Sequence, residues 1–197
     1  MKITVCLLAA GESSRFKGEK LLHVYRNKII TEHMLEKLNR LLDNDSISFQ
    51  KIVVTKPKLM EFFQQKLPNN WFLIQNKAYR KGMSTSLKLA VYEAIRQKSD
   101  WILLFLADMP LIKQKTIKRV IESIQVSPGK IIRPFFNGQP GFPVALPKDF
   151  FQELTLLTGD VGAKPVIEKH KELLIRLVCE DYGSIFDIDE EIRKKEE

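Results

Sequence analysis

Cysteine, histidine and long apolar runs are scarce in this chain, and each scarcity excludes a class of protein. Only two cysteines (Cys6 and Cys179) and three histidines occur among 197 residues. Two cysteines cannot form a disulfide framework, so we expect a reducing, cytoplasmic environment. No apolar run reaches the roughly 18 residues of a membrane span, and the first residues resemble a strand rather than a signal peptide. We therefore expect no membrane partner.

Several binding motifs are also missing. The loop after the first predicted strand contains neither a Walker A sequence nor G-x-G-x-x-G. Recognition motifs for DNA, and the interleaved aromatics of RNA-binding domains, do not occur. The formal net charge is nevertheless +8, and between Lys77 and Arg133 there are 12 basic residues and four acidic ones, a difference equal to that whole excess. This region favours a nucleotide or phosphate partner, with a solvated helix face or a basic RNA-binding domain as alternatives.

Apolar runs and helical periodicities alternate along the chain and predict the fold. We expect strands at 2–9, 51–55, 71–75, 100–107, 130–133, 141–146, 173–178 and 184–188, and helices at 32–42, 58–67, 84–97, 113–124 and 161–170. This alternation is typical of βαβ units, so it predicts an α/β fold with a mostly parallel sheet covered by helices on both faces. The length fits one domain, 1–189, followed by a charged tail, 190–197.

The loop after the first strand is the first candidate site. Small residues at Ala9, Ala10 and Gly11 would let a ligand approach the backbone, and the following amides could face phosphate oxygens. Arg15 and Lys20 could neutralise a triphosphate. The alternative is an ordinary strand-to-helix turn with two surface cations.

Later loops offer carboxylates and a helix start. Asp108 follows a buried strand, where it could hold Mg²⁺ or only cap the next helix. Ser84 is the expected N-cap of a helix whose free amides also suit an anion. Asp160 lies in a loop between two glycines, which indicates an unusual backbone conformation and makes Asp160 a candidate site residue. An ordinary turn also explains these glycines. Asp187 and Asp189 would share one face of a strand, which is either a site or the polar side of an edge strand.

Taken in order, these loops resemble the signature blocks of the MobA-like nucleotidyltransferases, and most closely the molybdenum cofactor cytidylyltransferase branch. The resemblance runs from about residue 3 to 189, on the segments 8–20, 82–87, 106–110, 141–144, 159–163 and 187–189. It implies a Rossmann-like three-layer α/β/α fold. It also implies Mg²⁺-dependent transfer of a nucleoside monophosphate from a nucleoside triphosphate to a phosphate acceptor, with release of pyrophosphate.

The resemblance also implies roles for individual residues. Catalytic roles fall to Arg15, Lys20 and Asp108, and the metal to Asp108 with Asp187 or Asp189. Acceptor binding falls to Gly141, Pro143 and Asp160. The residues expected to bind the nucleotide are Leu8, Ala9, Ala10, Gly11, Arg15, Lys20, Gly82, Ser84 and Ser86.

The substrate follows from small differences within the family. Guanylyl-transferring relatives have Ala-Gly-Gly in the first loop, whereas this chain has Ala9-Ala10-Gly11, which implies CTP, a molybdopterin acceptor and a molybdoenzyme or its chaperone as partner. Phe142 replaces the usual His of one acceptor block, and Lys164 replaces an Arg, which removes bidentate anion binding. Two alternatives therefore stay open: another small phosphate acceptor, and a non-catalytic chaperone that hands on the cofactor.

Overall fold

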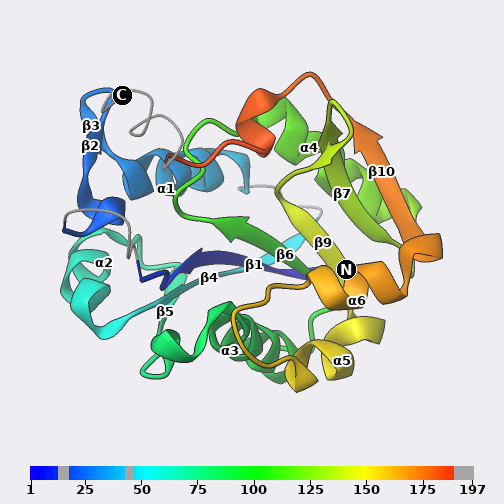
Figure 1. Ribbon diagram of the computed structural model, residues 1–197, viewed down its shortest axis with the longest axis horizontal. Helices are drawn as coiled ribbons and strands as arrows, with labels where there is room; N and C mark the ends of the chain where they lie inside the picture. Colours follow the sequence, from blue (N-terminus) through cyan, green and yellow to red (C-terminus); the bar gives the residue numbers. More distant parts are fainter. Residues whose placement is uncertain (13–17, 43–46, 189–197) are drawn as a thin grey trace.

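A single mixed sheet forms the centre of the computed structural model, which describes residues 1–12, 18–42 and 47–188 (Figure 1). The strands are ordered β10-β7-β9-β6-β1-β4-β5, and β8 pairs with β7. Their bounds are Lys2–Ala9 (β1), Ser48–Thr55 (β4), Trp71–Gln75 (β5), Trp101–Leu106 (β6), Ile131–Phe136 (β7), Gln139–Pro140 (β8), Val144–Pro147 (β9) and Leu174–Val178 (β10). A small hairpin of Val24–Tyr25 (β2) and Lys28–Ile29 (β3) lies outside this sheet.

Helices cover both faces of the sheet, which confirms the predicted three layers. Buried residues of α1, α2 and α4 form one core with one face, and those of α3, α5 and α6 form a second core with the other. In Figure 1, α1 and α4 lie above the strands, α2 lies to their left, and α3, α5 and α6 lie below them. The helices are Ile30–Leu41 (α1), Met60–Lys66 (α2), Met83–Arg96 (α3), Gln114–Val126 (α4), Phe151–Leu156 (α5) and Lys164–Lys169 (α6).

The first strand shows why the sheet is buried on both faces. Ile3, Val5 and Leu7 point into one core and Cys6 into the other, and all four side chains are fully buried. This two-sided burial explains the continuous apolar run, which is typical of parallel strands. Burial also raises the pKa of the Cys6 thiol, which keeps it protonated and unreactive.

The predicted mostly parallel sheet is confirmed, with two reversed strands, β8 and β9, in its second half. β1 runs parallel to β4 and β6, and β4 to β5, so four strands end at the same edge. β9 runs antiparallel to β6 and β7, whereas β10 is parallel to β7. Within the described residues, no helix is both long and apolar enough to cross a bilayer.

Some predicted elements differ from the structure. The segment 184–188 is not a strand: a 3₁₀ helix, η6, covers Tyr182–Ser184, and no strand follows it among the described residues. Asp187 is therefore not on a strand face, and Asp189 lies outside the described residues. The helix expected from 161 begins at Lys164, and α5 was not expected at all.

Close backbone contacts fix the course of this last segment. A side chain at Gly183 would meet the carbonyl oxygen of Leu111 at 2.2 Å, and one at Gly141 would meet that of Ser184 at 2.6 Å. The amide of Phe142 donates to the carbonyl of Ser184 at 2.7 Å. The segment 181–188 therefore lies against both the loop after β6 and the loop before β9.

Candidate active site

A cavity of about 470 Å³ opens at the edge where the parallel strands end. Its walls come from the loops after β1 and β6, from the 3₁₀ helix Lys20–Leu22 (η1), and from the start of α3. This is where an open α/β sheet places its ligands. The lining residues are Leu8, Ala10, Gly11, Glu12, Lys20, Leu21, Tyr79, Arg80, Lys81, Gly82, Met83, Ser86, Leu106, Asp108 and Asp160.

A buried lysine holds both ends of the first loop. The Nζ of Lys56 donates to the carbonyl of Gly11 at 2.7 Å and lies 2.9 Å from a carboxylate oxygen of Glu19. Lys56 directly follows β4, which neighbours β1 in the sheet. The loop between Gly11 and Glu19 is thereby anchored at each end, although Arg15 itself lies outside the described residues.

An ion pair between Lys20 and Asp108 occupies one side of the cavity. The Nζ of Lys20 donates to Oδ2 of Asp108 at 2.7 Å, and the Lys20 side chain is only 8% exposed. Lys20 is therefore not a surface cation. Asp108 follows β6 and is 24% exposed at its side chain, so its carboxylate reaches the cavity.

Asp108 does not cap the helix that follows it. The helix α4 begins at Gln114, and the carboxylate of Asp181 accepts from the amide of Lys113 at 2.9 Å and from the hydroxyl of Thr116. The structure thus assigns the capping role to a residue 68 positions downstream of Lys113. Asp108 is left to the cavity and to its bond with Lys20.

The start of α3 forms part of the opposite wall. Gly82 is the N-cap, with a φ of 103°, so the prediction of Ser84 as N-cap was wrong. A Cβ at Gly82 would lie 2.4 Å from the carbonyl carbon of Gly159, which leaves room only for glycine. Oδ1 of Asp160 accepts from the amide of Met83 at 3.0 Å, so the loop 159–160 caps the helix instead.

A buried asparagine that the sequence analysis missed orients this helix start. Asn76 directly follows β5 and is 1% exposed. Its Nδ2 donates to the hydroxyls of Thr85 and Ser86, each at 2.8 Å. Ser86 lines the cavity, whereas Ser84 is buried and does not line it. The sequence did contain a signal for Asn76, because it is a polar residue directly after a strand. The predicted site residues follow other strands that end at the same edge.

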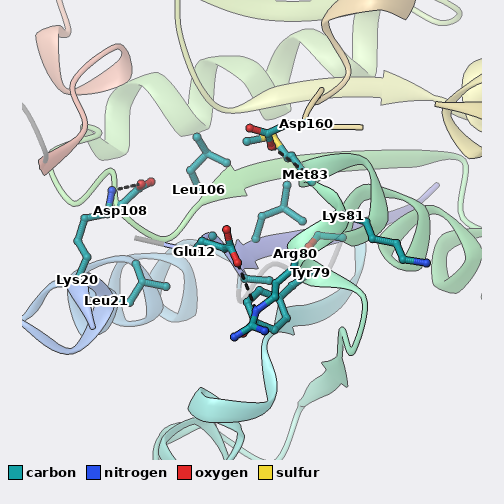
Figure 2. A pocket seen from close by; sticks show the side chains of 15 residues that line it. Glu12, Lys20, Leu21, Tyr79, Arg80, Lys81, Met83, Leu106, Asp108 and Asp160 are labelled. Atoms are coloured by element: carbon teal, nitrogen blue, oxygen red, sulfur yellow. Dashed lines mark hydrogen bonds and ion pairs between the residues drawn. The ribbon is translucent and has the colours of Figure 1, made fainter. Parts of the chain in front are cut away.

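Cations and an aromatic ring stand at the mouth of the cavity. Tyr79, Arg80 and Lys81 form a 3₁₀ helix, η3, and lie across the cavity from Lys20 and Asp108 in Figure 2. Arg80 is 78% exposed and its Nε lies 3.4 Å from a carboxylate oxygen of Glu12. These cations are placed to meet a polyanionic ligand as it enters.

The residues expected to bind the acceptor are divided between two places. Asp160 lines the first cavity, whereas Gly141 and Pro143 line neither it nor a second cavity of about 170 Å³. Their neighbours Phe142 and Val144 do line the second cavity. Gly141 is instead a packing residue, held against Ser184 and bonded through its carbonyl to Nε of Arg133 at 2.8 Å.

A model of the MobA-like NTP transferase domain matches residues 5–173. The chain belongs to this family. A probable molybdenum cofactor guanylyltransferase of Thermococcus sibiricus is 33% identical over 121 residues, which are 61% of this chain and 55% of that protein. A 2-C-methyl-D-erythritol 4-phosphate cytidylyltransferase of Dictyoglomus thermophilum is 27% identical over 125 residues, 61% of this chain and 51% of that protein. The chain thus matches about half the length of these relatives.

Solved structures show the same fold along nearly the whole chain. Rv0371c of Mycobacterium tuberculosis H37Rv superposes with a TM-score of 0.77 at 22% identity, covering 98% of this chain and 95% of that one. A complex of Rv0371c with manganese superposes with a TM-score of 0.71 at 20% identity, covering 98% and 97%. These likenesses confirm the Rossmann-like α/β architecture of the MobA-like chain.

The carboxylate of Asp108 fits a divalent cation in this family setting. Proteins hold Mg²⁺ through one or two carboxylates together with substrate phosphates and water. Among residues 1–12, 18–42 and 47–188, no group of three His, Cys, Asp or Glu side chains converges, so a metal here depends on ligand oxygens. The segment carrying Asp187 comes close, since the amide of Ile188 donates to the backbone carbonyl of Asp108 at 3.2 Å.

Proposed function

We propose that this chain transfers CMP from CTP to the phosphate of a molybdopterin-type acceptor and releases pyrophosphate, with Mg²⁺. The observation that carries the proposal is the Lys20–Asp108 pair, which lies beside the small-residue loop at Ala10 and Gly11 in a cavity of about 470 Å³. A phosphate-binding cation and a metal-binding carboxylate thereby face the same space. Family membership supports the reaction class.

The chemistry requires positioning and charge stabilisation rather than a covalent nucleophile. An oxygen of the acceptor phosphate forms a bond to the α-phosphorus of CTP, and the bond from that phosphorus to the bridging oxygen breaks, so the electron pair leaves with pyrophosphate. Lys20 binds a phosphate oxygen and stabilises the charge on the leaving group. Asp108 would hold Mg²⁺, which would supply neutralisation of phosphate charge.

Other residues orient the two substrates. The amides after Gly11 and the cations of Arg15, Arg80 and Lys81 attract the triphosphate, and the start of α3 at Gly82 faces the base and sugar. Ala10 in the first loop favours CTP, a choice that the relatives' names leave open because they include both guanylyl and cytidylyl enzymes. The product would pass to a molybdoenzyme or its chaperone in the cytoplasm.

Two measurements test the proposal. We expect CTP with Mg²⁺ to raise the melting temperature more than GTP, since a ligand at about 100 times its Kd stabilises the fold by about 2.7 kcal/mol. We also expect pyrophosphate release that requires both CTP and molybdopterin. Equal shifts with CTP and GTP would contradict the choice of base.

The same assays separate the alternatives. A chaperone would bind nucleotide or cofactor without releasing pyrophosphate, and another acceptor would replace molybdopterin in the turnover assay. An RNA-binding domain would ignore CTP and Mg²⁺ and lose its ligand steeply as salt rises.

A further inference from the structure

The second cavity adjoins the first but differs from it in character. It has a volume of about 170 Å³ and lies between the sheet and the helices α3 and α6. Leu8 and Met83 line both cavities, so the two spaces share a wall. The residues lining the second cavity are Leu8, Met83, Leu87, Leu104, Arg133, Phe142, Val144, Gly162, Ala163, Lys164 and Ile167.

The charged groups of this cavity are all cationic. Arg133 and Lys164 line it together with apolar side chains, and none of its lining residues is acidic. Lys164 is 76% exposed at its side chain and lies 3.6 Å from Glu168, so it belongs to the rim. Arg133 is half-buried, which places a cation against an apolar interior. Such a lining favours an occupant with an apolar body and electron-rich polar atoms.

Arg133 is held rigidly by its own surroundings. Its Nε donates to the carbonyl of Gly141 at 2.8 Å and its Nη2 to that of Pro140 at 3.4 Å. Its guanidinium carbon lies 5.5 Å from the centre of the Phe142 ring. Burial lowers the pKa of Arg133, a sign that its charge is partly removed from water.

The guanidinium still has donors to offer a ligand. None of the described residues accepts a hydrogen bond from Nη1 of Arg133. A guanidinium presents five N–H groups in a fixed fork, and two of its three nitrogens are used here by backbone carbonyls. The remaining donors suit a carbonyl, a ring nitrogen or an anionic oxygen, and Phe142 beside them offers a ring for stacking.

Volume decides which part of a ligand fits. Pockets that enclose a whole drug-sized ligand have about 300–1,000 Å³. The second cavity, at about 170 Å³, has room for one ring system and not for a complete cofactor. Since the reacting phosphate belongs beside Lys20 and Asp108 in the first cavity, the second can receive the opposite end of the same molecule.

We propose that the second cavity binds the end of the acceptor remote from its reacting phosphate: a flat, acceptor-rich heterocycle stacked near Phe142 and hydrogen-bonded by Arg133. This inference rests on the proposed function and assigns the specificity for the acceptor to Arg133 and Phe142. The wall shared at Leu8 and Met83 lets one molecule span both cavities. A phosphate ester without a ring would occupy only the first.

Steady-state kinetics with separate substrates test the assignment. Arg133→Met should raise the KM for molybdopterin about tenfold or more, because a lost hydrogen bond to a partly buried group costs roughly 1–3 kcal/mol. The Kd of Mg·CTP, measured by thermal shift, should change less than about twofold. Arg119→Met is the matched control, since Arg119 also donates to a backbone carbonyl, that of Val178 at 2.9 Å, but lines neither cavity.

Two further variants keep the test informative if Arg133→Met unfolds. Arg133→Lys retains the charge and loses the fork, and Phe142→Leu retains an apolar side chain and loses the ring. Each should raise the KM for molybdopterin while leaving the KM for CTP unchanged. A KM for molybdopterin equal to that of Arg119→Met in all three variants would overturn the inference.

A binding assay without turnover separates this inference from the proposed function. The probes are molybdopterin and glycerol 3-phosphate, which has a phosphate and no ring. The wild-type chain should bind molybdopterin more tightly, and Arg133→Met should remove that advantage. Equal binding of both probes by the wild type would overturn the inference even where pyrophosphate release succeeds. Failure of pyrophosphate release with a preserved preference for the ring would overturn only the proposed function.

Discussion

The two halves of the sheet build their parts of the site in different ways. In the half formed by β5, β4, β1 and β6, each strand delivers a residue of the site directly after its last residue or one position later. These residues are Asn76, Lys56, Gly11 and Asp108. In the half formed by β9, β7 and β10, the contributing residues are Arg133 inside β7 and Phe142 before β9.

The two halves also differ in the direction of one main strand, β9. Four parallel strands bring their carboxyl ends to one edge of the sheet. A residue that directly follows any of these strands therefore lies at the site. β9 runs the other way, and its carboxyl end lies at the opposite edge, beside the start of β6. The parallel half, β5, β4, β1 and β6, therefore carries the groups that we assign to the phosphate chemistry. In the other half only β9 is reversed, because β7 and β10 run in the direction of β6, and Arg133 reaches the second cavity from within β7.

Removal of the Asp108 carboxylate, a group of the parallel half, should have the largest effect on turnover. In Asp108→Asn, loss of the oxygen that we propose to hold Mg²⁺ should lower kcat by several orders of magnitude, because metal catalysis contributes several kcal/mol to stabilisation of the transition state. The amide oxygen can still accept from Lys20, so the fold should remain intact. Pyrophosphate release and circular dichroism are the measurements, with the exposed Asp149→Asn as control.

Asp108→Ala adds a second comparison. This change removes the Asp108 carboxylate from the buried ammonium of Lys20. Loss of one member of a buried ion pair costs roughly 3–5 kcal/mol, and less where the pair is partly exposed, as here. Combining it with Lys20→Met should restore much of that stability but none of the turnover. Near-normal turnover in either Asp108 variant would show that the parallel half does not hold the metal.

Lys20→Met should have the next largest effect and separates two roles of one side chain. If Lys20 stabilises charge on the departing pyrophosphate, kcat falls by orders of magnitude while the affinity for CTP weakens less. Its ion pair at 2.7 Å also predicts tighter Mg²⁺ binding by the nucleotide-free variant, because the ammonium no longer competes for Asp108. Isothermal titration and steady-state kinetics measure the two effects. A rise in KM with unchanged kcat would mean that Lys20 only anchors the ground state.

The contrast between the halves also separates what the sequence could predict from what it could not. Buried apolar runs located every strand of the parallel half. Residue type and position made the loops after β1 and β6 candidate sites, and the resemblance to the family implied their roles. These inferences are local, because the strand end and the functional group are neighbours in the chain. They needed only the general rule that parallel strands share an edge.

Contacts between distant segments were out of reach. The capping of α3 by Asp160, and of α4 by Asp181, depends on loops 77 and 68 residues away, so Ser84 and Asp108 were reasonable local candidates for those roles. The strand expected at 184–188 fails for a related reason. Its backbone bonds go to Asp108 and Phe142 instead of a neighbouring strand.

A pair of glycine substitutions should give a smaller, structural effect at the boundary between the halves. Gly82 and Gly129 both have positive φ, but only at Gly82 would a Cβ meet backbone, at 2.4 Å from Gly159. Gly129→Ala should cost about 1–2 kcal/mol of unfolding free energy, the ordinary penalty of a left-handed residue. Gly82→Ala should cost more and should weaken CTP binding, since the loop 159–160 must move away from α3. Equal costs in urea unfolding would contradict the close approach.

The smallest expected effect concerns Lys37, which supports the loop after β6. From α1 it donates to the carbonyls of Pro110, at 2.9 Å, and Ile112, in the loop that follows Asp108. Burial lowers the pKa of Lys37 below its usual 10.5, and the charge of Asp181 opposes this shift. The folded chain therefore binds fewer protons than the unfolded chain at pH values between the lowered pKa and 10.5.

The sign of the pH dependence follows from this difference in bound protons. Stability rises with pH wherever the unfolded state binds more protons, so the wild type should gain unfolding free energy relative to Lys37→Met as the pH rises toward 10.5. Urea unfolding of both proteins at neutral and alkaline pH measures the gain. Subtracting the unfolding free energy of the variant from that of the wild type cancels the contribution of other titrating lysines. Lys37→Met should also lower kcat modestly with little change in the KM for CTP, because the loop carrying Asp108 loses two hydrogen bonds but keeps the Asp108 carboxylate. A difference in stability that is constant with pH would show that Lys37 is as well hydrated in the folded chain as in the unfolded one.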